Sequence, residues 1–182
     1  ASHCLQIADV LMRDAQWLEV HQKTAESSKL FQDAMFWIDS GLKDSKTNQV
    51  LPGQFALYDA KLKLLLKSGS AANIIQQQLS AVNQIEHLTA NAIGHFYSGM
   101  LAHREGRLHK AQLHFEKAAT CKQLDLYRRA MTQLIPVYLA LEMPEPALLA
   151  IETVSKQFSK IENQRSEDIA WYDVFLRSGA ER

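Results

Sequence analysis

Five histidines lie close together in the sequence, and their type and number could support chemistry. They are His87, His95, His103, His109 and His114. A metal site on one helix needs two imidazoles at positions i and i+4, so that both face the same side. No pair has that spacing, because His95 and His103 are eight residues apart and His109 and His114 are five apart. Histidines of this group therefore converge only if a helical hairpin brings them together.

The same histidines suggest a second chemistry, pH sensing, because imidazole titrates near neutrality. The ordinary explanation of such a cluster is a set of exposed or locally hydrogen-bonded side chains. The two cysteines, Cys4 and Cys121, have no metal-type spacing and are too few for a disulfide framework. We expect no metal and no cofactor.

The sequence also lacks the motifs of nucleophilic, phosphate and acid-base chemistry. Gly94 and Gly99 have the separation of the glycines in a phosphate loop, but no Lys-Ser or Lys-Thr follows. Glu167 and Asp168 have no neighbouring base or nucleophile in the sequence. We therefore expect a protein that is not an enzyme.

The composition is that of an ordinary soluble protein. The chain has 182 residues, of which 47% are hydrophobic and 22% charged. It carries 20 basic and 20 acidic residues, so no net field attracts nucleic acid or an anionic membrane. The apolar run at residues 62–66 is far shorter than the roughly 20 residues that cross a bilayer. We expect no nucleic acid ligand, no membrane insertion, and a cytoplasmic rather than a secreted location.

The elements that must position these side chains are helices, because glycine and proline are few and no segment alternates like a strand. The predicted helices cover residues 3–20, 24–42, 54–67, 71–86, 89–104, 107–121, 124–141 and 145–158, with a ninth over 165–178 that covers the end of the last hairpin. Residues 44–53 form the longest predicted loop. This loop is the one candidate boundary in a single domain spanning 1–182, which we expect to be part of a larger protein.

The segment 92–123 has the composition of a closely packed helical hairpin. Small residues recur on both predicted helices, and a turn at Gly106 and Arg107 separates them. They are Gly99 and Ala102 on the first helix and Ala111 and Ala118 on the second. Small side chains let two helices approach, and Phe115 fills the space that this approach leaves.

This hairpin resembles a tetratricopeptide repeat, whose period is about 34 residues. Gly99, Ala111 and Phe115 match the family pattern, while His95, Ser98 and Ala102 replace its Trp, Leu and Tyr. The resemblance implies an all-α fold, with about four antiparallel hairpins stacked as an α-solenoid and a C-terminal capping helix. An all-helical bundle, in which the small residues merely permit local packing, is the alternative fold.

By resemblance, the first helix of each hairpin lines a groove that binds a partner. The groove positions are Ile93, Phe96, Met100, His103 and Arg104 in the best repeat, and Tyr58, Lys61, Arg129, Thr132 and Gln133 in the flanking hairpins. Phe96 and Met100 have a second interpretation, which is packing between repeats. The implied function is a non-catalytic scaffold for a partner protein, peptide or helix. The alternative is a ligand-sensing domain of a larger signalling or transcription-regulatory protein, and self-association through the open ends of the stack is also expected.

Overall fold

The described part of the chain is built from α-helices joined by short turns. The computed structural model describes residues 2–47, 51–121 and 123–156, and every regular element within these ranges is helical. The all-α class expected from the sequence is therefore confirmed. The helices are α1 (Ser2–Val20), α2 (Thr24–Thr47), α3 (Leu51–Lys67), α4 (Ala72–Asn83), α5 (Leu88–Arg104), α6 (Leu108–Ala118) and α7 (Leu124–Ala140), followed by a helix over 144–156.

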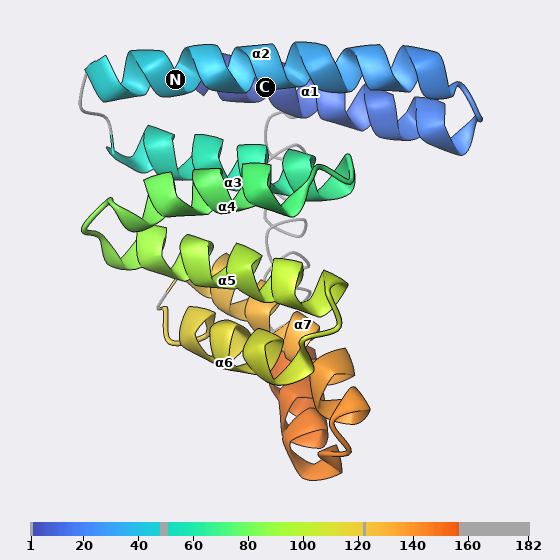
Figure 1. Cartoon of the computed structure of the whole chain (residues 1–182), viewed down its shortest axis with the longest axis vertical. Coiled ribbons are helices and arrows are strands. Elements are labelled where there is room, and N and C mark those ends of the chain that lie inside the picture. The colour runs from blue at the N-terminus through green and yellow to red at the C-terminus, as the bar shows by residue number, and fades with distance from the viewer. Residues whose placement is uncertain (1, 48–50, 122, 157–182) are drawn as a thin grey trace, which may run out of the picture.

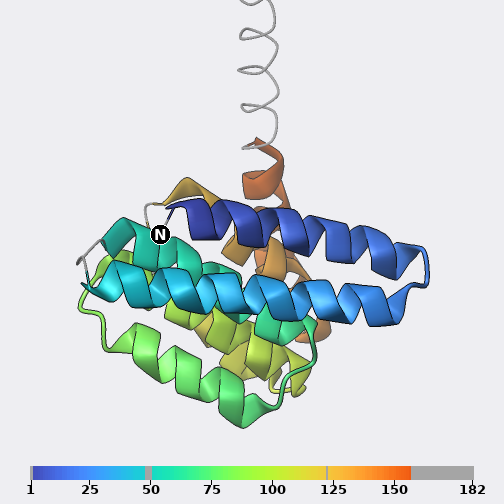
Figure 2. The same cartoon turned by 90° about the horizontal axis from the view of Figure 1, so that it is seen from above.

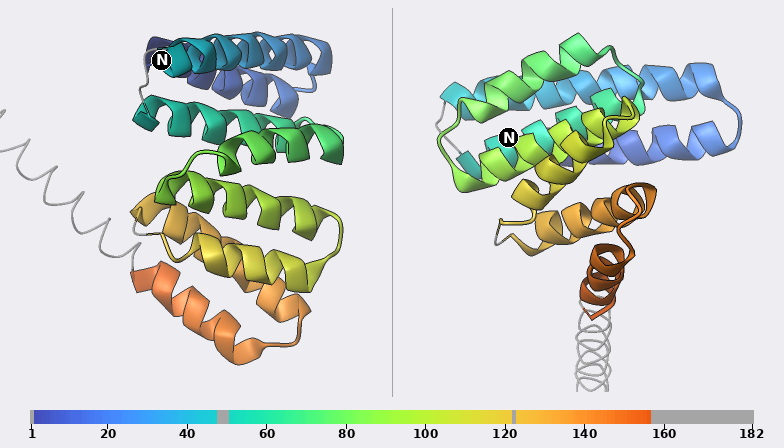
Figure 3. Two further views of the ribbon diagram at one scale, coloured as in Figure 1. Left: turned by 60° about the vertical axis from the view of Figure 1, so that its left-hand side comes forward. Right: turned by 60° about the horizontal axis from the view of Figure 1, so that its bottom comes forward.

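Consecutive helices form pairs that follow one another along the longest axis of the molecule (Figure 1). α1 packs on α2, α3 on α4, and α5 on α6, while α7 precedes the helix over 144–156. The first helix of each pair also contacts the first helix of the next pair, and α2, α4 and α6 each contact the helix that follows them. The side view in Figure 3 shows the same succession of pairs. Both helices of each pair thus contact the first helix of the next pair.

The four turns inside the pairs share one hydrogen-bonding geometry. One residue in each turn adopts the left-handed conformation, with φ values of 59° at Gln22, 68° at Gly69, 72° at Gly106 and 58° at Glu142. The amide of the next residue donates a hydrogen bond to the carbonyl five residues earlier, at 2.9–3.0 Å. These pairs are Lys23 to Leu18, Ser70 to Leu65, Arg107 to Ala102, and Met143 to Tyr138. This bond closes a Schellman-type helix end, which glycine forms without steric cost.

α5 and α6 approach each other closely at Gly99. A Cβ atom at this position would lie 2.7 Å from ring atoms of Phe115, whose side chain is fully buried. Ala102, Ala111 and Ala118 are also buried. The packing expected for the hairpin at 92–123 is confirmed, with Phe115 occupying the space that small residues leave.

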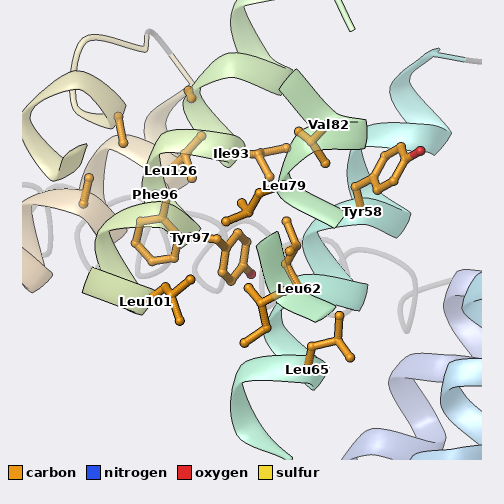
Figure 4. Close-up of a cluster of buried hydrophobic side chains, with 14 of the residues drawn as sticks. Tyr58, Leu62, Leu65, Leu79, Val82, Ile93, Phe96, Tyr97, Leu101 and Leu126 are labelled. Carbon is orange, nitrogen blue, oxygen red and sulfur yellow. The ribbon is translucent and has the colours of Figure 1, made fainter. Parts of the chain in front are cut away.

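The buried side chains form one core that runs through the successive pairs. Its central part lies between α3, α4 and α5 (Figure 4). Tyr97 of α5 points into this region, beside Leu62 of α3 and Leu79 of α4, and all three are 2% exposed or less. Tyr97 is therefore a buried aromatic residue whose hydroxyl needs a hydrogen-bond partner.

The predicted loop over 44–53 is wrong in most of its length. α2 continues to Thr47 and α3 begins at Leu51. Ser45 is fully buried and donates a hydrogen bond to the Leu42 carbonyl, while Gln54 Nε2 donates to the Ser45 carbonyl at 3.0 Å. Pro52 lies in the first turn of α3, where a missing amide donor costs nothing. Tertiary contacts thus make helix from residues whose composition favours a turn.

The remaining expected boundaries differ from the observed ones by a few residues. α4 ends at Asn83 and α6 ends at Ala118, in each case three residues earlier than predicted. The predicted helix over 165–178 lies outside the described residues. None of the helices in the described ranges has the length and apolar character needed to cross a membrane.

Candidate functional site

A concave pocket of about 700 Å³ is lined by residues of α1, α3, α5 and α7, the first helices of the four pairs. Seen from above, α1 and α7 lie on the same side of the molecule (Figure 2). The apolar side chains of the lining include Leu5, Met12, Phe55, Ile93 and Leu126. Its charged side chains are Asp9, Asp59, Lys63, Asp125 and Arg129. The pocket therefore offers an apolar surface with both signs of charge around it.

Arg129 donates several hydrogen bonds at the pocket. Its Nη1 donates to both carboxylate oxygens of Asp59 at 3.0 Å, and its Nη2 donates to the Tyr97 hydroxyl at 2.9 Å. The Tyr97 hydroxyl donates in turn to the Asp59 backbone carbonyl at 2.9 Å. The guanidinium also lies 4.5 Å from the centre of the Phe96 ring, a cation–π distance. One side chain of α7 thus joins α3 and α5.

These contacts fix the protonation states of the group. Burial, followed by the nearby Asp59 carboxylate, raises the pKa of Tyr97, so its hydroxyl keeps its proton. Burial alone lowers the pKa of Arg129, but the Asp59 carboxylate and the Tyr97 hydroxyl outweigh it and raise that pKa overall. A neutral phenol and a charged guanidinium are the states that these hydrogen bonds require. The group holds three helices together.

Two charged side chains of the pocket have no such partners. Asp9 of α1 and Lys63 of α3 are exposed, and neither forms an ion pair with another described residue. Asp125, by contrast, accepts a hydrogen bond from Arg128 at 2.8 Å and lies 3.8 Å from Arg129 Nη1. Asp9 and Lys63 are therefore the charges of the pocket that a partner could engage without breaking an existing pair.

The structure brings together three of the predicted groove residues. Ile93 and Arg129 line the pocket, and Phe96 is buried beneath the guanidinium of Arg129. Met100 is half-buried and packs against the core, as the packing interpretation expects. His103 is half-buried, and Arg104 is exposed and donates to the Ser70 carbonyl at 3.0 Å. Both lie outside the lining of the pocket.

The other predicted groove residues also lie outside it. Tyr58 is 3% exposed, with the Lys46 ammonium 5.7 Å from its ring centre, and Lys61 pairs with Asp39 at 2.6 Å. Both therefore contact α2. Thr132 is exposed and donates to the Arg128 carbonyl, while Gln133 is half-buried. Their role in partner binding stays a prediction.

Sequence reasoning missed the residues of α3 that do line the pocket. They are Pro52, Phe55, Ala56, Asp59, Ala60 and Lys63. Successive residues on a helix point about 100° apart. An error of one position in aligning this hairpin with the repeat pattern therefore assigns the groove to the wrong face of α3. The spacing of the apolar residues in α3 could have located this face, but Leu62, Leu64, Leu65 and Leu66 cover several sides of the helix and hide it.

Two of the five clustered histidines meet across the α5–α6 hairpin. Nδ1 of His95 lies 3.2 Å from Nδ1 of His114. Burial, and then the positive charge of Lys117, lowers the pKa of His95, and burial followed by His95 and nearby basic groups lowers the pKa of His114. His87 has a local role, since its Nδ1 accepts from the Thr89 amide at the start of α5. The described residues contain no group of three or more metal-ligating side chains.

Comparison with known proteins adds no relative from which a role could be transferred. No protein-family model, no curated protein and no solved structure matches this chain.

Proposed function

We propose that this protein is a non-catalytic interaction scaffold that binds a partner peptide or helix in the pocket on α1, α3, α5 and α7. The observation that carries the proposal is that residues of four successive first helices line one concave pocket. A surface assembled from several parallel segments suits an elongated ligand better than a compact one. Such a ligand would contact each pair in turn.

The proposal includes a tetratricopeptide-like stacking of the hairpins. Three observations support it: the contacts between successive first helices, the Gly99–Phe115 packing, and the recurrence of one turn geometry. The left-handed residues at 69, 106 and 142 are separated by 37 and 36 residues, close to the family period of about 34. The turn at residue 22 precedes the next by 47 residues, so the first pair is longer than the others.

The pocket has the composition expected for recognising a peptide. Its apolar side chains can bury one face of a helix or alternate side chains of an extended segment. Asp9 and Lys63 can then pair with a basic and an acidic group of the partner. We do not assign this role to Arg129, because Asp59 already neutralises its charge and both of its Nη atoms already donate to Asp59 and Tyr97.

The test is a selection of peptides from a displayed random library against the full chain, followed by affinity measurements on variants. Reversing the free charges of the pocket with Asp9→Lys and Lys63→Glu should weaken selected peptides by about tenfold or more. The matched control reverses Lys29 and Asp33, two exposed charges of α2 outside the pocket. Equal losses in both variants, or no loss in either, would remove the pocket as the binding surface.

The pocket volume favours one other function, the sensing of a small ligand by a regulatory domain. A volume of about 700 Å³ lies within the usual range of small-molecule sites, about 300–1,000 Å³. A thermal-shift screen of small molecules tests this function, because a ligand that binds the native state raises the midpoint of unfolding. The stabilisation should disappear in an Ala56→Trp variant, whose larger side chain fills part of the pocket. Hits that stabilise this variant equally bind elsewhere.

A further inference from the structure

A second hollow, of about 540 Å³, lies where the start of α5 faces the end of α6. Its lining includes the ammonium-bearing Lys117, the imidazole of His95 and the polar side chains of Thr89, Asn91 and Thr120. No aspartate or glutamate is among its lining residues. Among the described residues, the hollow thus presents hydrogen-bond donors and positive charge with no carboxylate to neutralise them.

Lys117 has no counter-ion within the described part of the chain. It is exposed and forms no ion pair there. Its charge instead acts on the two histidines, lowering the pKa of both. An anion placed between Lys117 and His95 would replace this repulsion with two attractive contacts.

We propose that this hollow is a binding site for a phosphate monoester or an equivalent dianion, held between the ammonium of Lys117 and the imidazole of His95. The proposal is independent of the peptide-binding function, because Lys117 and His95 do not line the first pocket, although the two hollows share His87, Thr89 and Gln123. Two positive groups match the charge of a phosphate monoester near neutral pH. Thr89 and Asn91 supply neutral groups that can donate to the remaining phosphate oxygens, whereas the Thr120 hydroxyl already donates to the Lys117 carbonyl.

Binding is coupled to the uptake of one proton through the His95–His114 pair. When both rings are neutral, only one of the two Nδ1 atoms in this 3.2 Å contact carries a proton, and it donates to the other. When His95 takes up a proton from solvent, its Nδ1–H donates to His114 and its Nε2–H is left to donate to the anion. His114 stays neutral as the acceptor, with its own proton on Nε2. The His114 acceptor therefore fixes the position of the His95 Nδ1 proton and leaves the Nε2–H for the anion.

The surrounding charges favour an anion over a metal ion. The titratable groups facing the pair are Lys110, Lys117 and Arg107 on the α6 side, and His87 and Cys121 on the wall of the hollow. Arg107 pairs with Glu105, but Lys110 and Lys117 form no ion pair with another described residue, and their charges repel a metal ion as they repel the protonated imidazole. They attract a phosphate group for the same reason.

The experiment is an NMR pH titration of the imidazole Hε1 signals of His95 and His114 in the full chain, with inorganic phosphate as the probe. We expect phosphate to raise the pKa of His95 by about one pH unit, with a saturable dependence on phosphate concentration. Sodium chloride at the same ionic strength is the control for simple screening. A phosphate effect that does not saturate and equals the chloride effect overturns the proposal.

Two variants and one further anion complete the test. Lys117→Met should weaken phosphate binding by about tenfold, while Lys29→Met, which removes an exposed charge of α2, should leave it unchanged. His95→Gln should bind phosphate weakly while keeping the midpoint of thermal unfolding in phosphate-free buffer. If the Lys117→Met variant binds phosphate as tightly as the wild type does, the proposal is overturned. Acetate that binds as tightly as phosphate overturns the assignment of a dianion.

Discussion

Arg129 and Asp59 are 70 residues apart in the chain, yet one guanidinium nitrogen lies 3.0 Å from both oxygens of the carboxylate. The pair joins α7 to α3 across α5. The hydroxyl of Tyr97, on α5, hydrogen-bonds to both residues. Both charged side chains are only slightly more than a quarter exposed. This contact therefore links the first helices of three successive pairs, and it can form only when those pairs are correctly stacked.

The first prediction concerns the loss of this ion pair. Arg129→Met should lower the free energy of unfolding by about 2 kcal/mol, because it leaves the Asp59 carboxylate and the Tyr97 hydroxyl with fewer partners. The measurement is urea unfolding of the wild type, Arg129→Met, Asp59→Asn and the double variant. The double variant should lose less than the sum of the single losses by about 1 kcal/mol. Additive losses would show that the two side chains do not stabilise each other.

The second prediction isolates the hydroxyl of Tyr97. Tyr97→Phe keeps the buried ring but removes the donor to the Asp59 carbonyl and the acceptor for Arg129. We expect a loss of about 1–2 kcal/mol in the free energy of unfolding. Tyr127→Phe is the matched control, because Tyr127 is half-buried on α7 and its hydroxyl has no partner among the described residues. A control that loses as much as Tyr97→Phe would contradict the interpretation.

The third prediction tests the close approach of α5 and α6. Gly99→Ala places a Cβ atom 2.7 Å from the Phe115 ring, which must move into a filled core. The strain, about 1–3 kcal/mol, exceeds the gain of about 1 kcal/mol from replacing a helical glycine with alanine. Thermal and urea unfolding should therefore show net destabilisation. The double variant Gly99→Ala/Phe115→Leu should lose less stability than the sum of the losses of the two single variants, because the smaller leucine leaves room for the new Cβ atom. Additive losses would argue against direct contact between residues 99 and 115.

The features that can be predicted from the sequence are those that depend on residues close together in the chain. Helical periodicity located every described helix, and Gly69 and Gly106 located two of the four turns, because glycine adopts the left-handed conformation without strain. Gly99 and Phe115 belong to one hairpin, so their contact follows from the local pattern. The all-α class and the packing of this hairpin were therefore predictable.

What the sequence did not reveal depends on contacts between distant segments. The Arg129–Asp59 pair requires the rotation of each helix about its axis to be known across three pairs, and the predicted face of α3 was rotated away from the pocket. The helical residues at 44–47 and 51–53 depend on tertiary contacts of Ser45 and Gln54. His95 and His114 come together from two helices, and no spacing within one helix indicates this.

The fourth prediction uses the two turns that lack glycine. Gln22 and Glu142 adopt φ values of 59° and 58°, which crowd a side chain against the backbone. Replacing either with glycine should raise the free energy of unfolding by about 0.5–1 kcal/mol, since glycine adopts this conformation readily. Gly106→Ala is the opposite control and should destabilise the protein. An added Cβ atom there has no neighbour within 4 Å, so only the left-handed φ of 72° opposes the substitution. Glycine variants that are no more stable than the wild type would contradict the prediction.

The fifth prediction concerns the pH dependence of stability. The pKa values of His95 and His114 are lowered in the folded state, chiefly by burial, so below about pH 6.5 the unfolded chain binds more protons than the folded one. The free energy of unfolding should therefore be highest above that pH and fall as the pH decreases towards the folded-state pKa values. Urea unfolding at several pH values from about 7.5 down to 5 measures this slope.

The contribution of the histidine pair to that slope can be separated from other groups. The double variant His95→Gln/His114→Gln should lose less stability on acidification than the wild type, since neither glutamine titrates. His109→Gln is the control, because His109 is an exposed histidine on the same helix as His114. A wild-type slope that persists in the double variant would assign the acid sensitivity to other groups. A slope that disappears in it would locate that sensitivity at the contact between α5 and α6.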